Sequence, residues 1–196
     1  MNREPPPGLL TDAEPEADPV EVAKQIILRQ LSHAPKTRHQ LAEVLRRRLV
    51  PDAAASRALD RITELGYIDD EAFARAWVES RHRSKALSER LLRRELGQRG
   101  VAPETIDQVL AAGVDVDSER AAATGLVEKK LRSMTRLDDQ TKTRRLVSML
   151  SRKGYSLSLA RGVVLSVLEG DHRDAGGVEA QDLAIERQLG FQRTDV

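Results

Sequence analysis

Hydrophobic residues recur along the middle of the chain at intervals of three and four positions, the spacing that places side chains on one face of an α-helix. The pattern predicts a first helix that begins near Pro19, a residue suited to a first helical turn, and ends around His33. A second helix is predicted from Thr37, because Gln40 follows at the spacing of a capping box, and it must stop before Pro51. The apolar positions of these two helices are Val22, Ala23, Ile26, Ile27 and Leu31, then Leu41, Val44, Leu45 and Leu49.

A third predicted helix completes a unit over residues 19–66. Asp52 is placed to cap its first turn, and Gly66 can end it in the left-handed conformation that most residues avoid. Its inward positions are Ala58, Leu59, Ile62 and Leu65.

The same layout then returns twice. Residues 67–115 form a second predicted unit, in which the expected helix starts and ends are Asp69 or Asp70, Ser88, Pro103 and Gly113. Residues 116–170 form a third, in which they are Asp117, Asp138 and Gly170. The intervals between the three final glycines are 47 and 57 residues, which indicates units that stack on their neighbours. The predicted fold is therefore all-α, with tandem three-helix repeats forming an elongated, curved, solenoid-like array.

Composition agrees with helices and distinguishes the two ends of the chain. Aromatic residues make up 3% and charged residues 32%, which suits helices with thin cores and argues against a large β-sandwich. Residues 1–18 are rich in acids and proline, and we expect them to be disordered. Residues 171–196 are rich in glycine and acids, and we expect a mobile tail.

The formal net charge of +1 hides an uneven distribution. Once the four basic and eleven acidic residues of the two ends are set aside, residues 20–170 hold 28 basic and 20 acidic residues. That balance favours anionic partners such as nucleic acid or an acidic protein surface.

The sequence offers little for catalysis. It has no cysteine, which excludes disulfides and thiolate chemistry, its four histidines lack metal-ligand spacing, and it contains no Walker-type glycine loop and no Gly-x-Ser-x-Gly elbow. We therefore expect no catalytic residue, no metal, no cofactor and no small-molecule substrate. No apolar run is long enough to cross a membrane, and we expect the protein in the cytoplasm.

One stretch is specific enough to suggest a family. Residues 66–81 read GYIDDEAFARAWVESR, and they are followed by LLRREL at 91–96 and by Arg99, Gly100 and Val101. These segments, together with residues 146–154, resemble proteins of the RecX family over roughly residues 20–170. The resemblance implies tandem three-helix repeats that bind the filament of the recombinase RecA and lie in its groove. It also implies restraint of the filament's ATPase, strand-exchange and coprotease activities, and so a role in regulating DNA repair and the SOS response.

The residues of this stretch also have structural interpretations. Gly66 is suited to end a helix, and Asp69 or Asp70 to cap the next one. Phe73 and Trp77 are spaced to pair inside the second unit, although the Trp77 ring could instead stack on a base. Arg81, one turn beyond Trp77, is predicted either to make a surface contact or to bond carbonyls at its helix end.

Clusters of basic residues are the better candidates for contacts with the filament or with DNA, and we expect them at comparable positions in the second helices of the three units. The candidates are Arg46, Arg47, Arg48, Arg81, Arg83, Lys85, Arg93, Arg94, Lys129, Lys130, Arg144, Arg145, Arg152 and Lys153. The expected partners are the RecA filament and single- or double-stranded DNA, with the protein acting as a monomer. The alternative is a helix-turn-helix transcription regulator, since units of this size also read the major groove.

Overall fold

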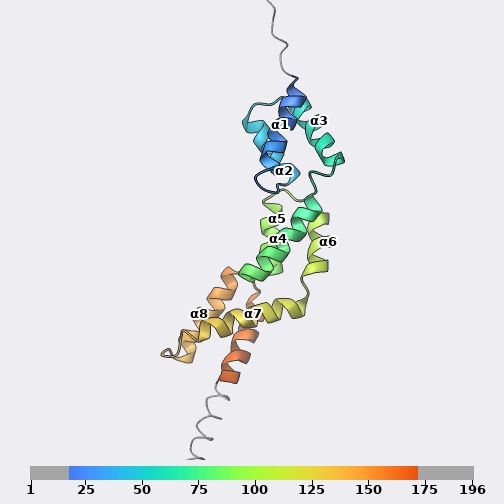
Figure 1. Ribbon diagram of the computed structural model, residues 1–196. Coiled ribbons are helices and arrows are strands. Elements are labelled where there is room, and N and C mark those ends of the chain that lie inside the picture. Colours follow the sequence, from blue (N-terminus) through green and yellow to red (C-terminus); the bar gives the residue numbers. More distant parts are fainter. Residues whose placement is uncertain (1–17, 172–196) are drawn as a thin grey trace, which may run out of the picture. The chain divides into compact units, whose positions relative to one another are not determined.

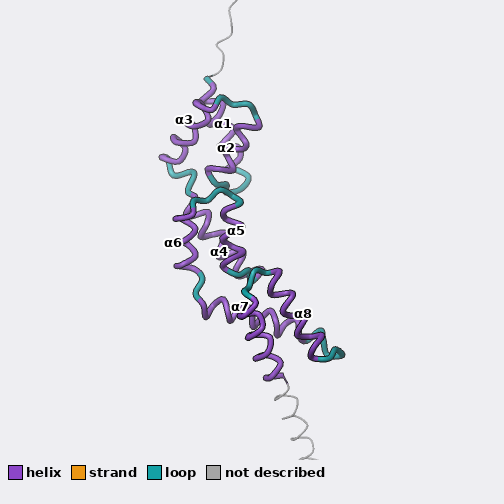
Figure 2. The backbone as a smooth tube through the Cα atoms, turned by 180° about the vertical axis from the view of Figure 1, so that it is seen from behind, coloured by secondary structure: helices purple, strands orange, loops and turns teal. Residues whose placement is uncertain are grey.

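Helices alone build the part of the chain that the structure, a computed structural model, describes, namely residues 18–171 (Figure 1). Nine helices and no strand lie in this range, and the loops between successive helices are short (Figure 2). The predicted all-α class is thus confirmed. The chain divides into two compact units, one up to Asp70 and one from Glu71 onward. The predicted disorder of residues 1–18 and mobility of residues 171–196 concern segments that lie outside the described residues except at one position each. Asp18 caps α1, and Asp171 belongs to the final helix.

The first unit packs α1 (Pro19–Leu31), α2 (Arg38–Arg47) and α3 (Asp52–Glu64) around one apolar core. Two predicted helix starts are confirmed. Pro19 lies in the first turn of α1, and Thr37 forms a capping box with Gln40, whose backbone N–H donates to the Thr37 hydroxyl at 3.2 Å. The core comprises Ala23, Ile27, Leu41, Leu45, Ala58, Leu59, Ile62 and Ile68.

Two predicted helix boundaries in this unit, the end of α1 and the cap of α3, differ from the structure. α1 ends at Leu31, two residues before His33. Asp52 does not cap α3, because Pro51 holds the cap position without a side-chain bond and Asp52 is the first helical residue. A carboxylate in the first turn is still favoured by the helix dipole, which explains why an acidic residue is found so close to the cap.

Two leucines predicted to face inward in this unit point to solvent instead. Leu49 is 89% exposed and Leu65 is 51% exposed. Both residues come after the last helical residue of their element, α2 and α3 respectively, where the chain changes direction. The helical period that predicts an inward side chain no longer applies there.

The second unit holds the other six helices. They are α4 (Asp70–Lys85), α5 (Glu89–Gly97), α6 (Pro103–Gly113), α7 (Val116–Leu131), α8 (Asp139–Arg152) and a final helix over residues 157–171. One core cluster gathers residues 74–114 and another gathers residues 123–168, so each cluster belongs to one set of three helices.

Most of the predicted helix starts in the second unit are confirmed. Ser88 caps α5 and Asp138 caps α8, each through a bond from a backbone N–H to its side chain. α7, however, begins earlier than predicted, since Asp115 is its cap and Asp117 lies in its first turn. α4 begins at Asp70, whose carboxylate accepts a bond from a backbone N–H of α2 at 2.8 Å.

The second helix of each repeat ends in the same turn. Just after α2, α5 and α8, one residue has a positive φ: Leu49 at 58°, Gly100 at 74° and Gly154 at 95°. The residue that follows it donates its N–H to the carbonyl five positions back at 3.2 Å in all three copies, which is the pattern of a Schellman motif. The turn places the repeats 51 and 54 residues apart.

This turn gives a different register from the one that the glycines suggest. Gly66 is left-handed as predicted, with φ 75°, but Gly113 is the last residue of α6 and Gly170 lies inside the final helix. In the new register, residues 46–48 correspond to 97–99 and 151–153. The basic clusters at Arg46–Arg48 and at Arg93 and Arg94, which we expected at comparable positions of the second helices, are therefore not equivalent. The equivalent basic residues are Arg48, Arg99 and Lys153. The curvature of the array stays a prediction.

Candidate functional site

A groove lined by basic side chains runs over α7, α8 and the C-terminal end of α4. It consists of two hollows of about 630 and 500 Å³ that share Lys130, Ser133 and Met149. None of the described residues that line it is an aspartate or a glutamate. We call this surface the basic groove, and its cations are Lys85, Lys129, Lys130, Arg144, Arg145, Arg152 and Lys153.

Apolar packing between α7 and α8 holds the walls of the groove. Val127 and Leu131 of α7 are buried in one cluster with Leu146 and Leu150 of α8. The basic residues of the groove, except Lys153, are exposed beside the buried leucines and valine. Lys142 of α8, which does not line the groove, is buried and pairs with Asp139 at 3.3 Å. The helical period thus separates the inward apolar side chains from the outward charges.

Hydrogen bonds join the end of α4 to the turn after α8. The Tyr155 hydroxyl donates to the carbonyl of Ala86 at 2.9 Å, and the N–H of Ser88 donates to the carbonyl of Lys153 at 3.1 Å. The ammonium of Lys153 donates to the carbonyl of Lys85. These bonds bring Lys85 to residues that lie more than forty positions further along the chain.

The cations of the groove are not neutralised by neighbours. None of the seven has an ion-pair partner among the residues that the structure describes. Burial lowers the pKa of Lys153 from its ordinary value, and the positive charge of Lys85 lowers it further. A bound anion would offset both effects, because it would supply the charge that the groove itself lacks.

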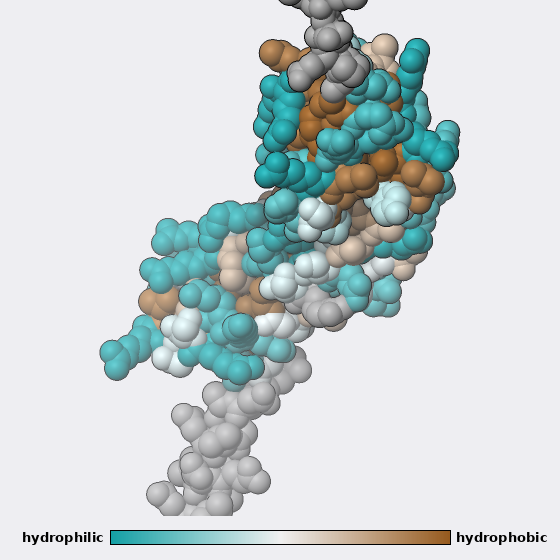
Figure 3. Space-filling view, turned by 45° about the horizontal axis from the view of Figure 1, so that its top comes forward, coloured by the Kyte–Doolittle hydropathy of each residue, from teal (hydrophilic) through white to brown (hydrophobic). Residues whose placement is uncertain are grey.

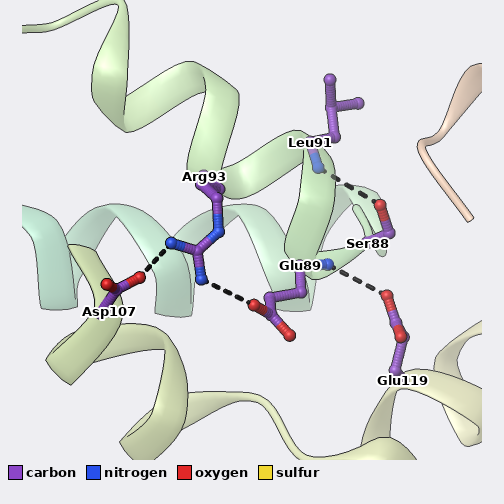
Figure 4. Close-up of polar contacts among 6 residues, drawn as sticks. All are labelled: Ser88, Glu89, Leu91, Arg93, Asp107 and Glu119. Carbon is purple, nitrogen blue, oxygen red and sulfur yellow. Dashed lines mark hydrogen bonds and ion pairs between the residues drawn. The ribbon is translucent and has the colours of Figure 1, made fainter. Parts of the chain in front are cut away.

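Other predicted contact residues are engaged within the second unit. Arg93 lies between two carboxylates: it donates to Glu89 at 2.9 Å and also pairs with Asp107 (Figure 4). The hydrogen bond to Asp107, followed by that to Glu89, raises the pKa of Arg93. Arg93 and Arg94 are both exposed, but no ion pair joins Arg94 to any residue that the structure describes. Arg93 is therefore already neutralised, whereas Arg94 stays available to a partner.

The first unit carries its own basic cluster at the end of α2. Arg46, Arg47 and Arg48 are all exposed, and Arg46 pairs with Glu43 at 2.7 Å. The hydrogen bond to Glu43 raises the pKa of Arg46. The side chain of Arg83, also a predicted contact, lies outside the described part of the chain.

Phe73 and Trp77 form the predicted aromatic pair, with ring centroids 5.9 Å apart and an angle of 14° between the rings. Both side chains are partly buried against the core of the second repeat. The indole N–H of Trp77 donates to Glu95 at 2.9 Å, and the guanidinium carbons of Arg81 and Arg99 lie 4.1 and 3.6 Å from the centroid of its ring. With these groups packed on the ring, the structure gives no support to stacking of Trp77 on a base.

Arg81 thus does something that neither sequence interpretation anticipated. Its guanidinium lies over Trp77 and pairs with Glu95 at 3.6 Å. Arg99 was not among the predicted residues, yet it donates to the Glu95 carbonyl at 2.7 Å and covers the same ring. The four-residue spacing between Glu95, on α5, and Arg99, in the turn that follows α5, was the one signal that could have indicated this contact.

Gly154 is a second residue that the sequence did not single out. A Cβ built on it would lie 2.8 Å from the Cβ of Leu91 and closer still to the Ser88 hydroxyl. Next to this contact, the Glu89 N–H donates to the Glu119 carboxylate at 3.0 Å, which bridges α5 and α7 (Figure 4). The second and third repeats therefore meet at a tight junction beside the basic groove.

Three family models match consecutive parts of the chain. They are the first, second and third three-helix domains of RecX, matched at residues 23–61, 69–110 and 117–164. Regulatory protein RecX of Streptomyces coelicolor is 48% identical over 161 residues, which cover 82% of this chain and 85% of that protein. The chain belongs to the RecX family. Regulatory protein RecX of Mycolicibacterium smegmatis is also similar, at 44% identity over 81% of this chain and 87% of the relative.

Solved structures of RecX proteins share the fold. The crystal structure of RecX from Lactobacillus salivarius matches with a TM-score of 0.69 at 18% identity, covering 77% of this chain and 97% of that one. A second crystal structure, of a regulatory protein RecX, matches with a TM-score of 0.65 at 22% identity, covering 75% of this chain and 72% of that one. The predicted tandem three-helix repeats of this RecX-family chain are thus confirmed.

Family membership supports a regulatory role for the chain, as the shared name of its relatives states. The described residues contain no cluster of three or more side chains suited to hold a metal ion. Among the same residues, no helix has both the length and the apolar character needed to span a bilayer.

Proposed function

We propose that this RecX-family protein binds the filament formed by the recombinase RecA on DNA and inhibits its ATPase, strand-exchange and coprotease activities. The basic groove is the observation that supports this proposal most directly. Its seven cations have no acidic partner among the described residues, so a polyanion would gain favourable contacts there without breaking existing ion pairs. DNA phosphates and acidic side chains of a filament both meet this requirement.

Inhibition of this kind needs binding energy alone. A protein that contacts neighbouring subunits of a filament stabilises whichever arrangement of the subunits it binds best, and so opposes the changes that accompany turnover. Three linked repeats suit this task, because once one repeat has bound the filament, the other two are held close to their own contact sites and bind as if intramolecularly. The protein would act as a regulator of DNA repair and the SOS response, as a monomer in the cytoplasm, without a covalent step.

The contact residues can be divided by what each one does within the chain. We assign partner contacts to the basic groove and to the exposed residues Arg47, Arg48 and Arg94. Arg46 is exposed as well but pairs with Glu43. Arg81 and Arg93 instead hold internal contacts, with Trp77 and with two carboxylates respectively. Replacing Arg81 or Arg93 would therefore test the fold of the second repeat before it tested binding.

The test is the ATPase of RecA on single-stranded DNA with substoichiometric amounts of the full chain. Wild-type protein should suppress the ATPase, and a Lys129→Gln, Lys130→Gln variant should need roughly tenfold more protein for the same suppression, since two charge-assisted contacts are lost. Its affinity for the filament should also depend less steeply on salt. A matched control is Arg57→Gln with Arg120→Gln, which removes the same charge from exposed residues outside the groove.

Three outcomes would contradict the proposal at different levels. Unchanged ATPase turnover with equimolar wild-type protein would overturn the regulatory role itself. Equal inhibition by the groove variant and its control would leave the role intact but exclude the basic groove as the contact. Selection of one defined sequence from random duplex DNA would favour the helix-turn-helix transcription regulator instead.

A further inference from the structure

Leu49 combines two unfavourable features at the end of α2. Its backbone has a φ of 58°, in the left-handed region that residues with a Cβ avoid, and its side chain is 89% exposed. The equivalent residues in the other repeats are Gly100 and Gly154, which adopt the same turn without a clash involving Cβ. A glycine at 49 would remove both penalties.

The fold of the first unit makes no use of the Leu49 side chain. It is absent from the apolar core cluster of α1, α2 and α3 and from the partly buried residues packed against that cluster. Hydrophobic residues are visible on the surface of this unit in Figure 3. The exposed side chains of Arg46, Arg47 and Arg48 precede Leu49 directly, so an apolar tip stands next to a cluster of positive charge.

We propose that Leu49 is an apolar anchor that inserts into a pocket on a partner protein, where carboxylates at the rim of the pocket contact Arg47 and Arg48. The partner chemistry is thus an apolar pocket edged by acidic side chains. Interfaces draw most of their affinity from a few side chains that become fully desolvated, surrounded by charged or polar contacts that exclude water. This inference rests on the proposed function, which supplies the filament as the protein to be bound.

A protein pocket fits this site better than nucleic acid does. Phosphate groups bind best at helix N-termini, where the helix dipole and free N–H groups favour negative charge. Leu49 follows the C-terminus of α2, where the dipole has the opposite sign, and its side chain offers a phosphate no hydrogen bond. Burial in an apolar pocket is indifferent to the dipole.

The test compares variants of the full chain for binding to RecA filaments on single-stranded DNA and to the same DNA alone. Leu49→Gly and Leu49→Asn suit the left-handed turn but lack the apolar side chain. Both variants should therefore have a melting temperature equal to or above that of the wild type. Their affinity for filaments should be lower than that of the wild type by a factor of about ten or more. Leu49→Met keeps an apolar side chain and should bind close to wild type. Leu65→Ala is the matched control, because Leu65 is also exposed in the first unit but has an ordinary φ of −77°, and it should change affinity less than about twofold.

The outcomes separate this inference from the function on which it rests. If wild-type protein binds filaments and Leu49→Gly binds them equally well, the anchor is wrong and the proposed function stands. If wild-type protein does not bind filaments, the proposed function fails first. An equal loss of affinity for bare DNA would overturn the protein pocket in favour of nucleic acid.

Discussion

Replacing Gly154 by alanine tests the junction between the second and third repeats. Gly154 follows α8 with a φ of 95°, and its backbone lies against the start of α5. The added methyl carbon would lie 2.8 Å from the Leu91 Cβ, 3.3 Å from the Leu91 backbone nitrogen and closer than either to the Ser88 hydroxyl. The Leu91 Cβ and the Leu91 backbone nitrogen are fixed by the backbone of α5, so a side-chain rotation cannot move them away.

Two penalties add in this variant. A non-glycine residue in the left-handed region loses about 1 to 2 kcal/mol of stability, and overpacking a tight contact loses about 1 to 3 kcal/mol more. We expect a total loss of about 2 to 5 kcal/mol in the free energy of unfolding. The melting temperature of a unit of roughly 100 residues falls by about 4 to 8 °C for each kcal/mol lost, so the change is easily measured.

The control is Gly66→Ala, because Gly66 has a φ of 75° but no atom lies within 4 Å of the position that the new methyl carbon would take. That variant should lose the conformational part only, about 1 to 2 kcal/mol. Urea unfolding followed by far-ultraviolet circular dichroism gives both values, each compared with the wild-type transition of its own unit. Equal losses in the two variants would refute the tight junction.

A double-mutant cycle tests whether the Ser88 hydroxyl is the group that the new methyl carbon at position 154 meets. Ser88→Ala removes the cap of α5 and should destabilise the wild type by about 1 kcal/mol, but it also removes the atom nearest to the new methyl group. In the Gly154→Ala background the same change should therefore be less harmful, with a coupling of about 0.5 kcal/mol or more. Additive losses would mean that the Ser88 hydroxyl is not what the methyl group meets.

Two further predictions concern single side chains of the second unit. Trp77→Ala should lower the free energy of unfolding by about 2 to 4 kcal/mol, because the ring is partly buried and donates to Glu95, and a loss under about 1 kcal/mol in urea unfolding would contradict this. The hydrogen bond from the backbone N–H of Thr141 lowers the pKa of Asp138 below its ordinary 3.8, so the stabilisation is present above that pH and is lost as pH falls through the folded-state pKa. Asp138→Asn caps without titrating, and its urea midpoint should fall less below pH 4 than that of the wild type; parallel curves would contradict the assignment.

Much of the fold follows from local chemistry, and so the sequence predicts it. Helix caps are an example: the side-chain oxygens of Thr37, Ser88 and Asp138 each accept a bond from a backbone N–H three residues later, at the start of a helix with apolar periodicity. The cap and the N–H that it accepts are only three residues apart, so a short stretch of sequence contains the signal. The misplaced starts at Asp52 and Asp117 arise from the same chemistry, since an acid is favourable both at the cap and in the first turn.

The candidate site depends on contacts between residues far apart in the chain, and local patterns do not contain them. Lys85 joins the basic groove only because the end of α4 is bonded to the turn after α8. Arg93 is removed from the set of free charges by Asp107, a residue of the next helix. The sequence could name both as basic candidates, but which of them keeps an unneutralised charge is decided by tertiary packing.

Trp77 is the single tryptophan of the chain, so tryptophan fluorescence reports on the second repeat alone. Excitation of the indole would sample one neighbourhood only, in which Glu95 accepts the indole N–H and Arg81 and Arg99 lie over the ring. A partner that drew Arg81 or Glu95 toward itself would change the polarity around the indole, and with it the wavelength of the emitted light. Binding of a partner to the second repeat could then be followed by tryptophan fluorescence in unlabelled protein. Its rate could be measured separately from that of binding at the other two repeats, which contain no tryptophan.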